Sequence, residues 1–398
     1  MDITITPKRL SGSVKAVASK SYAHRILIAA ALCDSPTKIN IDTTSEDIEA
    51  TKTCIKALGV KIEEGPGFIT VIPKKKGNII KSCVLDCNES GSTARFLLPV
   101  AAVLCESFSM TGKGRLPERP FTPLISQMTE KGVNISSDTL PLSSQGVMSG
   151  GTFKMPGDVS SQYISGLLFA LGLCTCESKI ILTSPLESAA YVDMTIDVLL
   201  KFGVKIKKTE FGFEIQPSKF KSPGEITVEG DWSNAAFWVV LGKICPDVKV
   251  TGLNYDSIQG DKKILDVLCD DIIDASQIPD LVPILCVNAC IKNSKTVIKN
   301  AHRLRLKESD RLRAITNCLS SLGADIKELP DGLIIKGKGK LSGGICDGFN
   351  DHRIVMSAAI ASALSENPVT IKGTEAVNKS YPTFFEDFKS LGGCFKTE

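Results

Sequence analysis

One phrase recurs six times in this chain of 398 residues, and it constrains the fold more than any other feature. In each copy, a polar loop rich in Ser, Asx, Gly or Arg runs directly into a helix-length segment of small and apolar residues. Equivalent positions in the six copies are Ser21, Ser92, Ser161, Asn234, Asp280 and His352. The steps between these positions are 71, 69, 73, 46 and 72 residues, so the chain is a series of near-equal repeats with one short step.

A second recurring feature lies between these phrases, where a helical segment ends in glycine and β-rich segments follow. We interpret the glycines as left-handed residues that end helices, and the alternating β-branched residues after them as hairpins. The glycines are Gly59, Gly132, Gly203, Gly323 and Gly392, at steps of 73, 71, 120 and 69 residues. The long step of 120 residues, from Gly203 to Gly323, is roughly the length of two repeats minus the length of a strand pair. Both features therefore predict that the fourth repeat, near residues 260–276, has lost a helix, its glycine and a hairpin.

The six apolar segments predict the fold class, which is α/β with two domains. Each segment is apolar nearly all round, as expected of an inner helix that is covered by sheet. Six repeats then form two groups of three, each a core of helices wrapped by sheets that contain the hairpins. We expect the chain to start one domain, build the other and return. The predicted domains are residues 1–18 with 228–398, and residues 19–227.

The composition excludes several classes of function. Lys and Arg number 47 against 44 Asp and Glu, so a polybasic face for nucleic acid or membrane binding is not expected. The longest apolar stretch, residues 163–176, is too short to span a bilayer, and the N-terminus has no apolar signal core. The 14 cysteines show no regular framework and the three histidines lack metal-ligand spacing. We therefore expect a cytoplasmic protein with reduced thiols and no metal site.

The polar loops before the helices are candidate anion-binding sites, because a helix N-terminus presents unpaired N–H groups and a positive dipole end. KSYAHR places Lys20 and Arg25 at one such start, and ESGSTAR offers Gly91 and Arg95 at another. Each loop taken alone is equally compatible with helix capping or solvated charge, and a structural role is preferred for His24 and His302. The repeated occurrence of arginines at helix starts favours a cleft between the domains that binds several phosphates or carboxylates.

The stretch HRLRLKESDRLRA, residues 302–314, carries the densest positive charge. Alternating Leu and Arg predict a strand over residues 303–306, followed by a helix with apolar residues at helical spacing. Lys307 and Arg311 are four residues apart and could grip one anion from a shared face. Glu308, an acid among these cations, could move a proton. Arg305 and Arg313 are interpreted as solvated or structurally paired charges.

Taken together, these motifs resemble the enolpyruvyl transferases, and the resemblance runs from end to end of the chain. The motifs are KSYAHR at 20–25, SGSTAR at 90–95, PERP at 117–120, SSQ at 160–162, SAAY at 188–191, EGDWSNAAF at 229–237, IPD at 278–280, LKESDR at 306–311, DHR at 351–353 and NKSYPTFF at 378–385. The resemblance implies an inside-out α/β barrel fold with six βαβαββ-type repeats in two domains that close on substrate. The implied reaction transfers the enolpyruvyl group of phosphoenolpyruvate to the 5-hydroxyl of shikimate 3-phosphate.

The resemblance also implies roles for individual residues. Lys20 would contact both substrates, Asp280 would accept the proton of the 5-hydroxyl, and Glu308 or Lys20 would protonate the enol methylene. The residues implied to hold shikimate 3-phosphate are Ser21, Arg25, Ser160, Ser161, Gln162, Ser188, Tyr191, Asp280, Arg303 and Lys307. Those implied to hold phosphoenolpyruvate are Gly91, Arg119, Gln162, Arg311, Arg353 and Lys379. The family uses no metal or organic cofactor, and a monomer is expected.

Three departures from the family pattern leave alternatives open. Glu89 replaces a common Asn and either points away from the site or pairs with Arg95, while Arg303 replaces a common Asn. The shortened fourth repeat raises the alternative of a weakly active or non-catalytic homologue that binds anions. Transfer to UDP-N-acetylglucosamine is a further alternative, but the loop at residues 111–123 lacks the cysteine expected of that enzyme.

Overall fold

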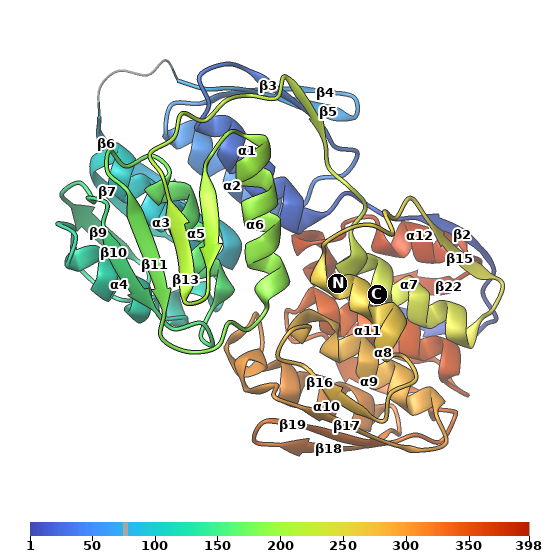
Figure 1. Ribbon diagram of the computed structural model, residues 1–398. Coiled ribbons are helices and arrows are strands. Elements are labelled where there is room, and N and C mark those ends of the chain that lie inside the picture. The colour runs from blue at the N-terminus through green and yellow to red at the C-terminus, as the bar shows by residue number, and fades with distance from the viewer. Residues whose placement is uncertain (75–78, 398) are drawn as a thin grey trace. The chain divides into compact units, whose positions relative to one another are not determined.

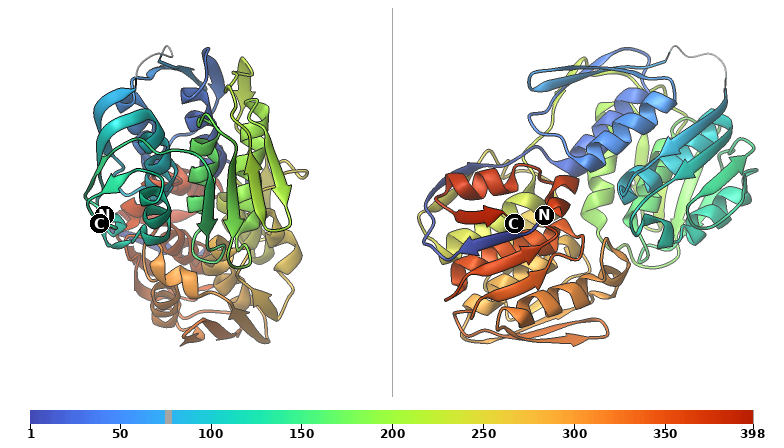
Figure 2. Two further views of the ribbon diagram at one scale, coloured as in Figure 1. Left: turned by 60° about the vertical axis from the view of Figure 1, so that its left-hand side comes forward. Right: turned by 180° about the vertical axis from the view of Figure 1, so that it is seen from behind.

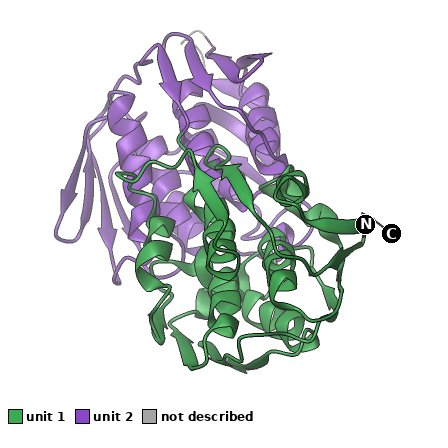
Figure 3. Cartoon of the chain, turned by 90° about the vertical axis from the view of Figure 1, so that its right-hand side faces the viewer, with its two compact units in different colours: residues 1–19, 229–398 green, residues 20–228 purple. Residues whose placement is uncertain are grey.

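A computed structural model describes residues 1–74 and 79–397 of the chain. The chain divides into two compact units, of which unit 1 comprises residues 1–19 and 229–398 and unit 2 comprises residues 20–228 (Figure 3). The chain therefore passes from one unit to the other at Ser19–Lys20 and again at Val228–Glu229.

Unit 2 contains three repeats. The second and third run strand, helix, strand, helix and hairpin, whereas the first begins with a helix and its sheet is completed by the last strand of the unit. Its helices are α1 (Lys20–Ala31), α2 (Glu46–Ala57), α3 (Gly91–Leu104), α4 (Thr122–Thr129), α5 (Ser161–Leu171) and α6 (Ala189–Lys201), with a 3-10 turn η1 (Leu116–Glu118). Its strands are β3 (Thr37–Asn40), β4 (Lys61–Gly65), β5 (Phe68–Ile72), β6 (Ile80–Asp86), β7 (Cys105–Thr111), β8 (Asn134–Ile135), β9 (Leu142–Gln145), β10 (Thr152–Met155), β11 (Ser178–Leu182), β12 (Ile206–Thr209), β13 (Gly212–Ile215) and β14 (Glu225–Thr227).

Unit 1 contains the other three repeats. Its helices are α7 (Trp232–Ile244), α8 (Ile264–Val267), α9 (Val282–Ile291), α10 (Arg311–Ser321), α11 (His352–Ala361) and α12 (Phe384–Ser390), with 3-10 turns η2 (Gly260–Lys263), η3 (Pro279–Leu281), η4 (His302–Leu306), η5 (Ser362–Leu364) and η6 (Thr374–Lys379). Its strands are β1 (Ile3–Thr6), β2 (Gly12–Lys15), β15 (Val248–Thr251), β16 (Ile272–Asp274), β17 (Lys295–Lys299), β18 (Asp325–Leu329), β19 (Gly332–Lys336), β20 (Gly344–Asp347), β21 (Val369–Lys372) and β22 (Cys394–Thr397).

Five sheets share one four-stranded pattern, in which a parallel strand pair is extended by an antiparallel hairpin. In unit 2 the sheet orders are β14-β3-β5-β4, β6-β7-β9-β8 and β10-β11-β13-β12. In unit 1 they are β16-β17-β19-β18 and β20-β21-β1-β22, where the last hairpin is closed by the N-terminal β1 instead of by a following strand. Figures 1 and 2 show these sheets lying outside the helices within each unit. The predicted α/β fold with βαβαββ-type repeats is therefore confirmed.

The fourth repeat is shortened, as predicted. Its parallel pair, β2 with β15, stands alone as a two-stranded sheet without a hairpin. A 3-10 turn, η2, and the single turn α8 take the place of a full second helix. The structure thus locates the missing segment after β15, where the two sequence features placed it.

The remnant of this repeat is hydrogen-bonded to both places where the chain changes unit. Gln259 Nε2 donates to Glu229 Oε1 at 2.7 Å and to the carbonyl oxygen of Gly230 at 2.8 Å. Gln259 Oε1 accepts from Ser19 Oγ at 3.1 Å and from the backbone N–H of Trp232 at 3.2 Å. The deletion has therefore spared the part of the repeat that ties the two crossing segments together within unit 1.

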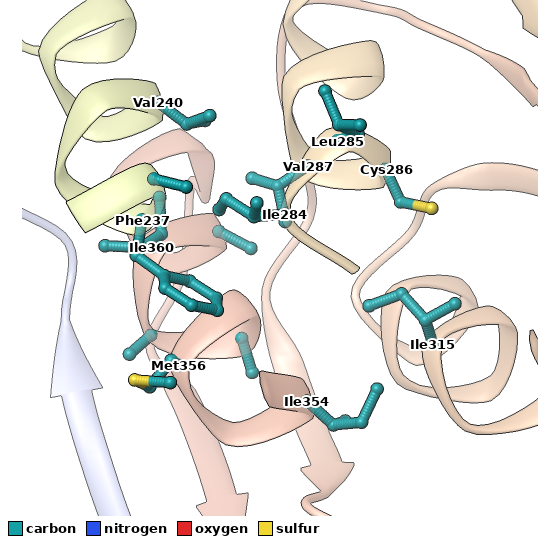
Figure 4. Packing of buried hydrophobic residues seen from close by; sticks show 14 of the residues in the cluster. Phe237, Val240, Ile284, Leu285, Cys286, Val287, Ile315, Ile354, Met356 and Ile360 are labelled. Carbon is teal, nitrogen blue, oxygen red and sulfur yellow. The ribbon is translucent and has the colours of Figure 1, made fainter. Parts of the chain in front are cut away.

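The inner helices form the cores, as their all-round apolar sequences predict. In unit 1, α7, α9 and α11 pack through residues such as Phe237, Ile284 and Met356 (Figure 4). In unit 2, α1, α3 and α5 are buried along nearly their whole length. The five predicted glycines all have φ between 80° and 96°, which only glycine adopts easily, so they end their helices as expected.

Candidate functional site

Arg311 is the centre of a buried charge cluster in unit 1. Asp310 caps α10 by accepting from the backbone N–H of Arg313, which places Arg311 at the first position of the helix. The Arg311 guanidinium donates to Asp351 Oδ2 through Nε at 2.8 Å and to Glu308 Oε2 at 2.7 Å. It also donates to Asp280 Oδ1 at 2.8 Å. Burial alone would lower the pKa of Arg311, but the three carboxylates outweigh it and raise that pKa, so the side chain is a fixed cation.

Asp280 receives cations from three directions. Its Oδ1 lies 2.8 Å from Arg311 Nη1 and 3.5 Å from Lys307 Nζ, and its Oδ2 accepts from Arg353 Nη2 at 3.1 Å. Burial alone would raise the pKa of Asp280, but Arg353, Lys307 and Arg311 hold it well below the ordinary value. Burial lowers the pKa of Lys307, with only partial compensation from Asp280. Asp280 is therefore ionised at neutral pH.

The predicted grip of Lys307 and Arg311 on one anion exists, but the anion is a side chain of the protein. Both cations contact the same oxygen of Asp280. Glu308, Asp280 and Asp351 balance the positive charges of the cluster, so an anionic ligand would have to compete with carboxylates for these cations. The cluster is a set of ion pairs among side chains of the protein and carries no large excess of positive charge.

Lys379 is held at the start of α11 by a backbone of unusual conformation. Its Nζ donates to the carbonyl oxygen of Asn350 at 2.7 Å. Phe349 and Asn350 have φ of 52° and 50°, which is strained for residues other than glycine. Asp351 follows directly and caps α11, so this strained turn positions Asp351 and Lys379 together.

The predicted strand over residues 303–306 is wrong, because residues 302–306 form the 3-10 turn η4. Leu304 is buried but Leu306 is 57% exposed, so the two leucines do not share one buried face. The helix predicted after this stretch is confirmed as α10. Arg305 has the expected structural pairing, with Asp310 at 2.9 Å and with Glu328 at 2.7 Å. Arg303 donates to the carbonyl oxygen of Ser276 at 2.8 Å.

Lys20 begins α1 of unit 2 and forms an ion pair with Asp47. Its Nζ lies 2.7 Å from Asp47 Oδ2, and both side chains are mostly buried. Asp47 lies in the first turn of α2, which Ser45 caps. A carboxylate near the positive end of a helix is stabilised there, so Asp47 is a fixed partner for Lys20.

Arg25 is engaged on three sides by protein oxygens. Nε donates to Thr195 Oγ1 at 2.8 Å, while the two Nη groups donate to the carbonyl oxygens of Ser21 at 2.7 Å and Tyr191 at 2.8 Å. Burial lowers the pKa of Arg25 to about 10, which leaves it charged at neutral pH. Arg25 therefore fixes the starts of α1 and α6 relative to each other.

Gly91, Arg95, Arg119 and Gln162 meet around the start of α3. A Cβ on Gly91 would lie 2.6 Å from Arg95 Nη1 and 2.9 Å from Arg119 Nη1, so glycine permits the close approach of both guanidiniums. Gln162 accepts from Arg95 Nη1 at 3.3 Å and donates to Ser92 Oγ at 2.9 Å. The Glu89 carboxylate lies against Gly114, since an added Cβ there would approach Glu89 Oε2 to 2.5 Å.

The predicted serines lie at two further helix starts of unit 2. Ser160 caps α5, its Oγ accepting from the backbone N–H of Gln162 at 3.3 Å, and Ser161 is the buried first residue of that helix. Ser188 precedes α6 with φ of 53° and ψ of 41°, a left-handed conformation that is unusual for serine. The Tyr191 backbone N–H donates to the carbonyl oxygen of Ser188 at 3.1 Å, within this first turn.

Comparison with known proteins gives one consistent result. The sequence matches the family model of EPSP synthase (3-phosphoshikimate 1-carboxyvinyltransferase) over residues 5–273 and 270–388. It is 42% identical to the 3-phosphoshikimate 1-carboxyvinyltransferase of Clostridium novyi (strain NT), with 98% of each chain covered. It is 43% identical to that of Clostridium perfringens (strain ATCC 13124), covering 100% of this chain and 99% of the relative. The chain belongs to the EPSP synthase family.

Solved structures agree with this membership. The EPSP synthase of Acinetobacter baumannii superposes with a TM-score of 0.81 at 25% identity, covering 100% of both chains. The enolpyruvyl transferase NikO from Streptomyces tendae has a TM-score of 0.79 at 16% identity, covering 99% of this chain and 98% of that one, which supports the fold alone. The inside-out α/β fold implied by the sequence motifs is therefore that of this EPSP synthase family member.

Sequence reasoning missed several residues that position the candidate site of this EPSP synthase family member. Asp47 pairs with Lys20, and Asp351 binds Arg311. Asp351 could have been found from its place before a helical His-Arg pair, where an N-cap is expected. Asp47 gave no such signal, because its partner lies on a different helix.

No candidate metal site was found in residues 1–74 and 79–397, where no group of three or more His, Cys, Asp or Glu side chains could hold an ion. Over the same described ranges, no helix is long and apolar enough to cross a membrane. All fourteen cysteines are free thiols.

Proposed function

We propose that this chain transfers the enolpyruvyl group of phosphoenolpyruvate to the 5-hydroxyl of shikimate 3-phosphate and releases phosphate, as a monomer that needs no cofactor. Membership of the EPSP synthase family supports the reaction. The observation that carries the assignment of roles is the ionised Asp280, which Arg311, Arg353 and Lys307 surround. This reaction needs a carboxylate base, a proton donor and cations for two anionic substrates.

Asp280 is the proposed base that removes the proton of the 5-hydroxyl. A carboxylate whose pKa is strongly lowered is ionised but is a weak base. An anionic ligand that binds Arg311 and Arg353 would draw these cations away from Asp280 and raise its proton affinity. Substrate binding would in this way strengthen the base at the moment when it is needed.

Glu308 and Lys20 are the proposed proton donors to the enol methylene of phosphoenolpyruvate. Glu308 now binds Arg311 at 2.7 Å, and Lys20 binds Asp47 at 2.7 Å. Protonation at the methylene carbon gives the neighbouring carbon cationic character, and the 5-hydroxyl oxygen attacks it. Phosphate then leaves the tetrahedral adduct and the new methyl group gives up a proton, which restores the carbon–carbon double bond of the enolpyruvyl group.

The other predicted residues are proposed to bind the substrates. Shikimate 3-phosphate is assigned to Ser21, Ser160, Ser161, Gln162, Ser188, Tyr191, Arg303 and Lys307, and phosphoenolpyruvate to Gly91, Arg119, Gln162, Arg311, Arg353 and Lys379. Arg25 is also assigned to shikimate 3-phosphate, in addition to its hydrogen bonds to three protein oxygens at the starts of α1 and α6.

The shortened repeat is compatible with activity. Asp280 is held by Arg311, Arg353 and Lys307, all of which lie in the fifth and sixth repeats. Ser233, at the start of α7 in the fourth repeat, accepts from Arg353 at 3.3 Å and belongs to the retained part. We therefore expect an active enzyme in place of a binding protein without catalysis.

The test is phosphate release by the purified chain with phosphoenolpyruvate, in the presence and absence of shikimate 3-phosphate. Release that requires both substrates is expected, and Asp280→Asn should abolish it in protein that circular dichroism shows to be folded, though less stable than wild type. Release with UDP-N-acetylglucosamine in place of shikimate 3-phosphate would instead assign the chain to enolpyruvyl transfer onto UDP-N-acetylglucosamine. A folded chain that releases none with either acceptor would refute it.

A further inference from the structure

A chain of buried polar side chains connects His24 in α1 with Ser90, the residue that caps α3. His24 Nδ1 lies 2.7 Å from Thr51 Oγ1 in α2, and Thr51 Oγ1 lies 2.7 Å from Thr93 Oγ1 in α3. Thr93 Oγ1 donates to Ser90 Oγ at 2.7 Å. The four side chains are at most 1% exposed, so bulk water does not replace any link of the chain.

The hydroxyl protons give the chain a direction. Thr93 has one hydroxyl proton, which it donates to Ser90 Oγ at 2.7 Å or to the more distant carbonyl oxygen of Asp47 at 3.5 Å, so none remains for Thr51. Thr93 must then accept the proton of Thr51, and Thr51 must accept a proton from His24 Nδ1. The network therefore assigns His24 the neutral tautomer with the proton on Nδ1, which leaves a lone pair on Nε2.

The surroundings of Nε2 agree with this direction. Nε2 of His24 is buried and has no hydrogen-bond partner among the described residues. A charged ring would carry a proton on both nitrogens, and its Nε2–H would have no acceptor. A neutral ring protonated on Nε2 would have the same unsatisfied N–H. A bare lone pair is the remaining arrangement. Burial, with Lys20 and Arg25 nearby, lowers the pKa of His24 well below its ordinary value and keeps the ring neutral.

The chain ends where a candidate ligand-binding loop begins. Ser90 Oγ accepts from both the hydroxyl and the backbone N–H of Thr93, at 2.7 Å and 3.3 Å, and thereby fixes the first turn of α3. Gly91, the next residue, lies against the Arg95 and Arg119 guanidiniums. Thr93 also lies 3.5 Å from the carbonyl oxygen of Asp47, the partner of Lys20.

We infer that His24 and Thr51 are positioning residues for phosphoenolpyruvate, which hold the Gly91 loop through a directed hydrogen-bond chain across α1, α2 and α3. This inference rests on the proposed function for the identity of the ligand. Neither residue touches the substrate in this assignment, and their effect reaches it through Thr93, Ser90 and Gly91. A role in packing alone would not favour one substrate over the other.

The first experiment compares Thr51→Val with Thr51→Ser. Valine has nearly the shape of threonine but no hydroxyl, whereas serine keeps the hydroxyl and loses a methyl group. We expect Thr51→Val to raise the KM for phosphoenolpyruvate roughly ten-fold, from the loss of a buried hydrogen-bond link. The KM for shikimate 3-phosphate should stay unchanged, and Thr51→Ser should restore the wild-type value for phosphoenolpyruvate. Equal changes in both constants, no change in either, or no rescue by serine would overturn the inference.

The second experiment reads the tautomer of His24 in the wild-type protein and does not depend on activity. The chain has only three histidines, so long-range nitrogen–proton NMR correlations of a histidine-labelled sample can be assigned with His24→Asn. A proton on Nδ1 is expected, and a proton on Nε2 would overturn the inference. If the wild-type protein releases no phosphate, the proposed function fails and the tautomer alone decides the direction of the chain.

Discussion

The two units present their candidate ligand-binding groups in different chemical forms. In unit 1, the guanidinium of Arg311 is surrounded by three carboxylates, and ion pairs dominate the site. In unit 2, the start of α3 is fixed by neutral hydroxyls and the ring of His24. An anion that binds in unit 1 would have to exchange these ion pairs. In unit 2, neutral hydrogen bonds hold the start of α3, although Lys20 of that unit is itself ion-paired with Asp47. The same kind of repeat therefore fixes its helix starts with ion pairs in one place and with neutral hydrogen bonds in another.

The difference has an energetic consequence. Removing one partner from a buried ion-pair cluster leaves other charges uncompensated, which costs several times more than losing one neutral hydrogen bond. Removal of Arg311, the central cation of the unit 1 cluster, should therefore reduce stability and activity together. Substitutions in the hydroxyl chain of unit 2 should alter ligand affinity with a smaller effect on stability.

The largest expected effect is that of Arg311→Met, which leaves Asp280, Glu308 and Asp351 without their shared cation. We expect a loss of roughly 3–5 kcal/mol in the free energy of unfolding, together with loss of phosphate release. Urea unfolding and the phosphate assay would measure both. Arg313→Met, an exposed position two residues along the same helix, is the matched control and should behave as wild type. A small effect at position 311 would show that the carboxylates are compensated in another way.

Lys307→Met tests whether the exchangeable cations bind substrate. Lys307 Nζ is 3.5 Å from Asp280 Oδ1, a long contact that contributes little to stability. We expect the affinity for shikimate 3-phosphate to fall by roughly 1.5–3 kcal/mol, the value of a charge-assisted contact, as measured by titration calorimetry. The exposed Lys338→Met serves as control. Unchanged affinity would remove Lys307 from the binding set.

The sequence alone was sufficient to predict the repeat architecture, because its signals are local and recur. Apolar helices after polar loops and glycines such as Gly59 report on burial and backbone conformation at their own positions. The missing hairpin could be located because two independent spacings both broke at the fourth repeat.

The pairing of charges could not be predicted from the sequence, because it depends on contacts between distant segments. Lys307 and Arg311 were expected to grip an external anion, and the sequence did not show that both contact Asp280, which lies 31 residues before Arg311 in the same repeat. The strand predicted near Leu304 was wrong for a related reason. Alternation over four residues is a weak signal, and η4 instead places Arg305 against Asp310 and Glu328.

The hydroxyl chain of unit 2 predicts a particular dependence of stability on pH. The folded protein keeps His24 neutral with a lowered pKa, while the unfolded chain takes up a proton below about pH 6.5. The contribution of neutral His24 to the free energy of unfolding should therefore be fully present above that pH. Below it, the free energy of unfolding should fall by up to about 1.4 kcal/mol per pH unit. Urea unfolding of His24→Asn should show a shallower fall than wild type. The exposed His302→Asn should not, and equal slopes for all three proteins would contradict a buried neutral His24.

The smallest expected effect on stability is that of Gly91→Ala, which sharpens the comparison at the ligand-binding loop. The added Cβ would approach Arg95 Nη1 to 2.6 Å and Arg119 Nη1 to 2.9 Å. Both contacts are with the ends of flexible side chains, which can move, so the free energy of unfolding should change by less than about 1 kcal/mol. The displaced guanidiniums should nevertheless raise the KM for phosphoenolpyruvate roughly ten-fold, equivalent to about 1.4 kcal/mol.

An unchanged KM for shikimate 3-phosphate in the same assay is the internal control for Gly91→Ala. A rise in both constants would mean that the loop serves the two substrates alike, and the contrast between a pre-positioned unit 2 site and an exchangeable unit 1 site would then have to be redrawn.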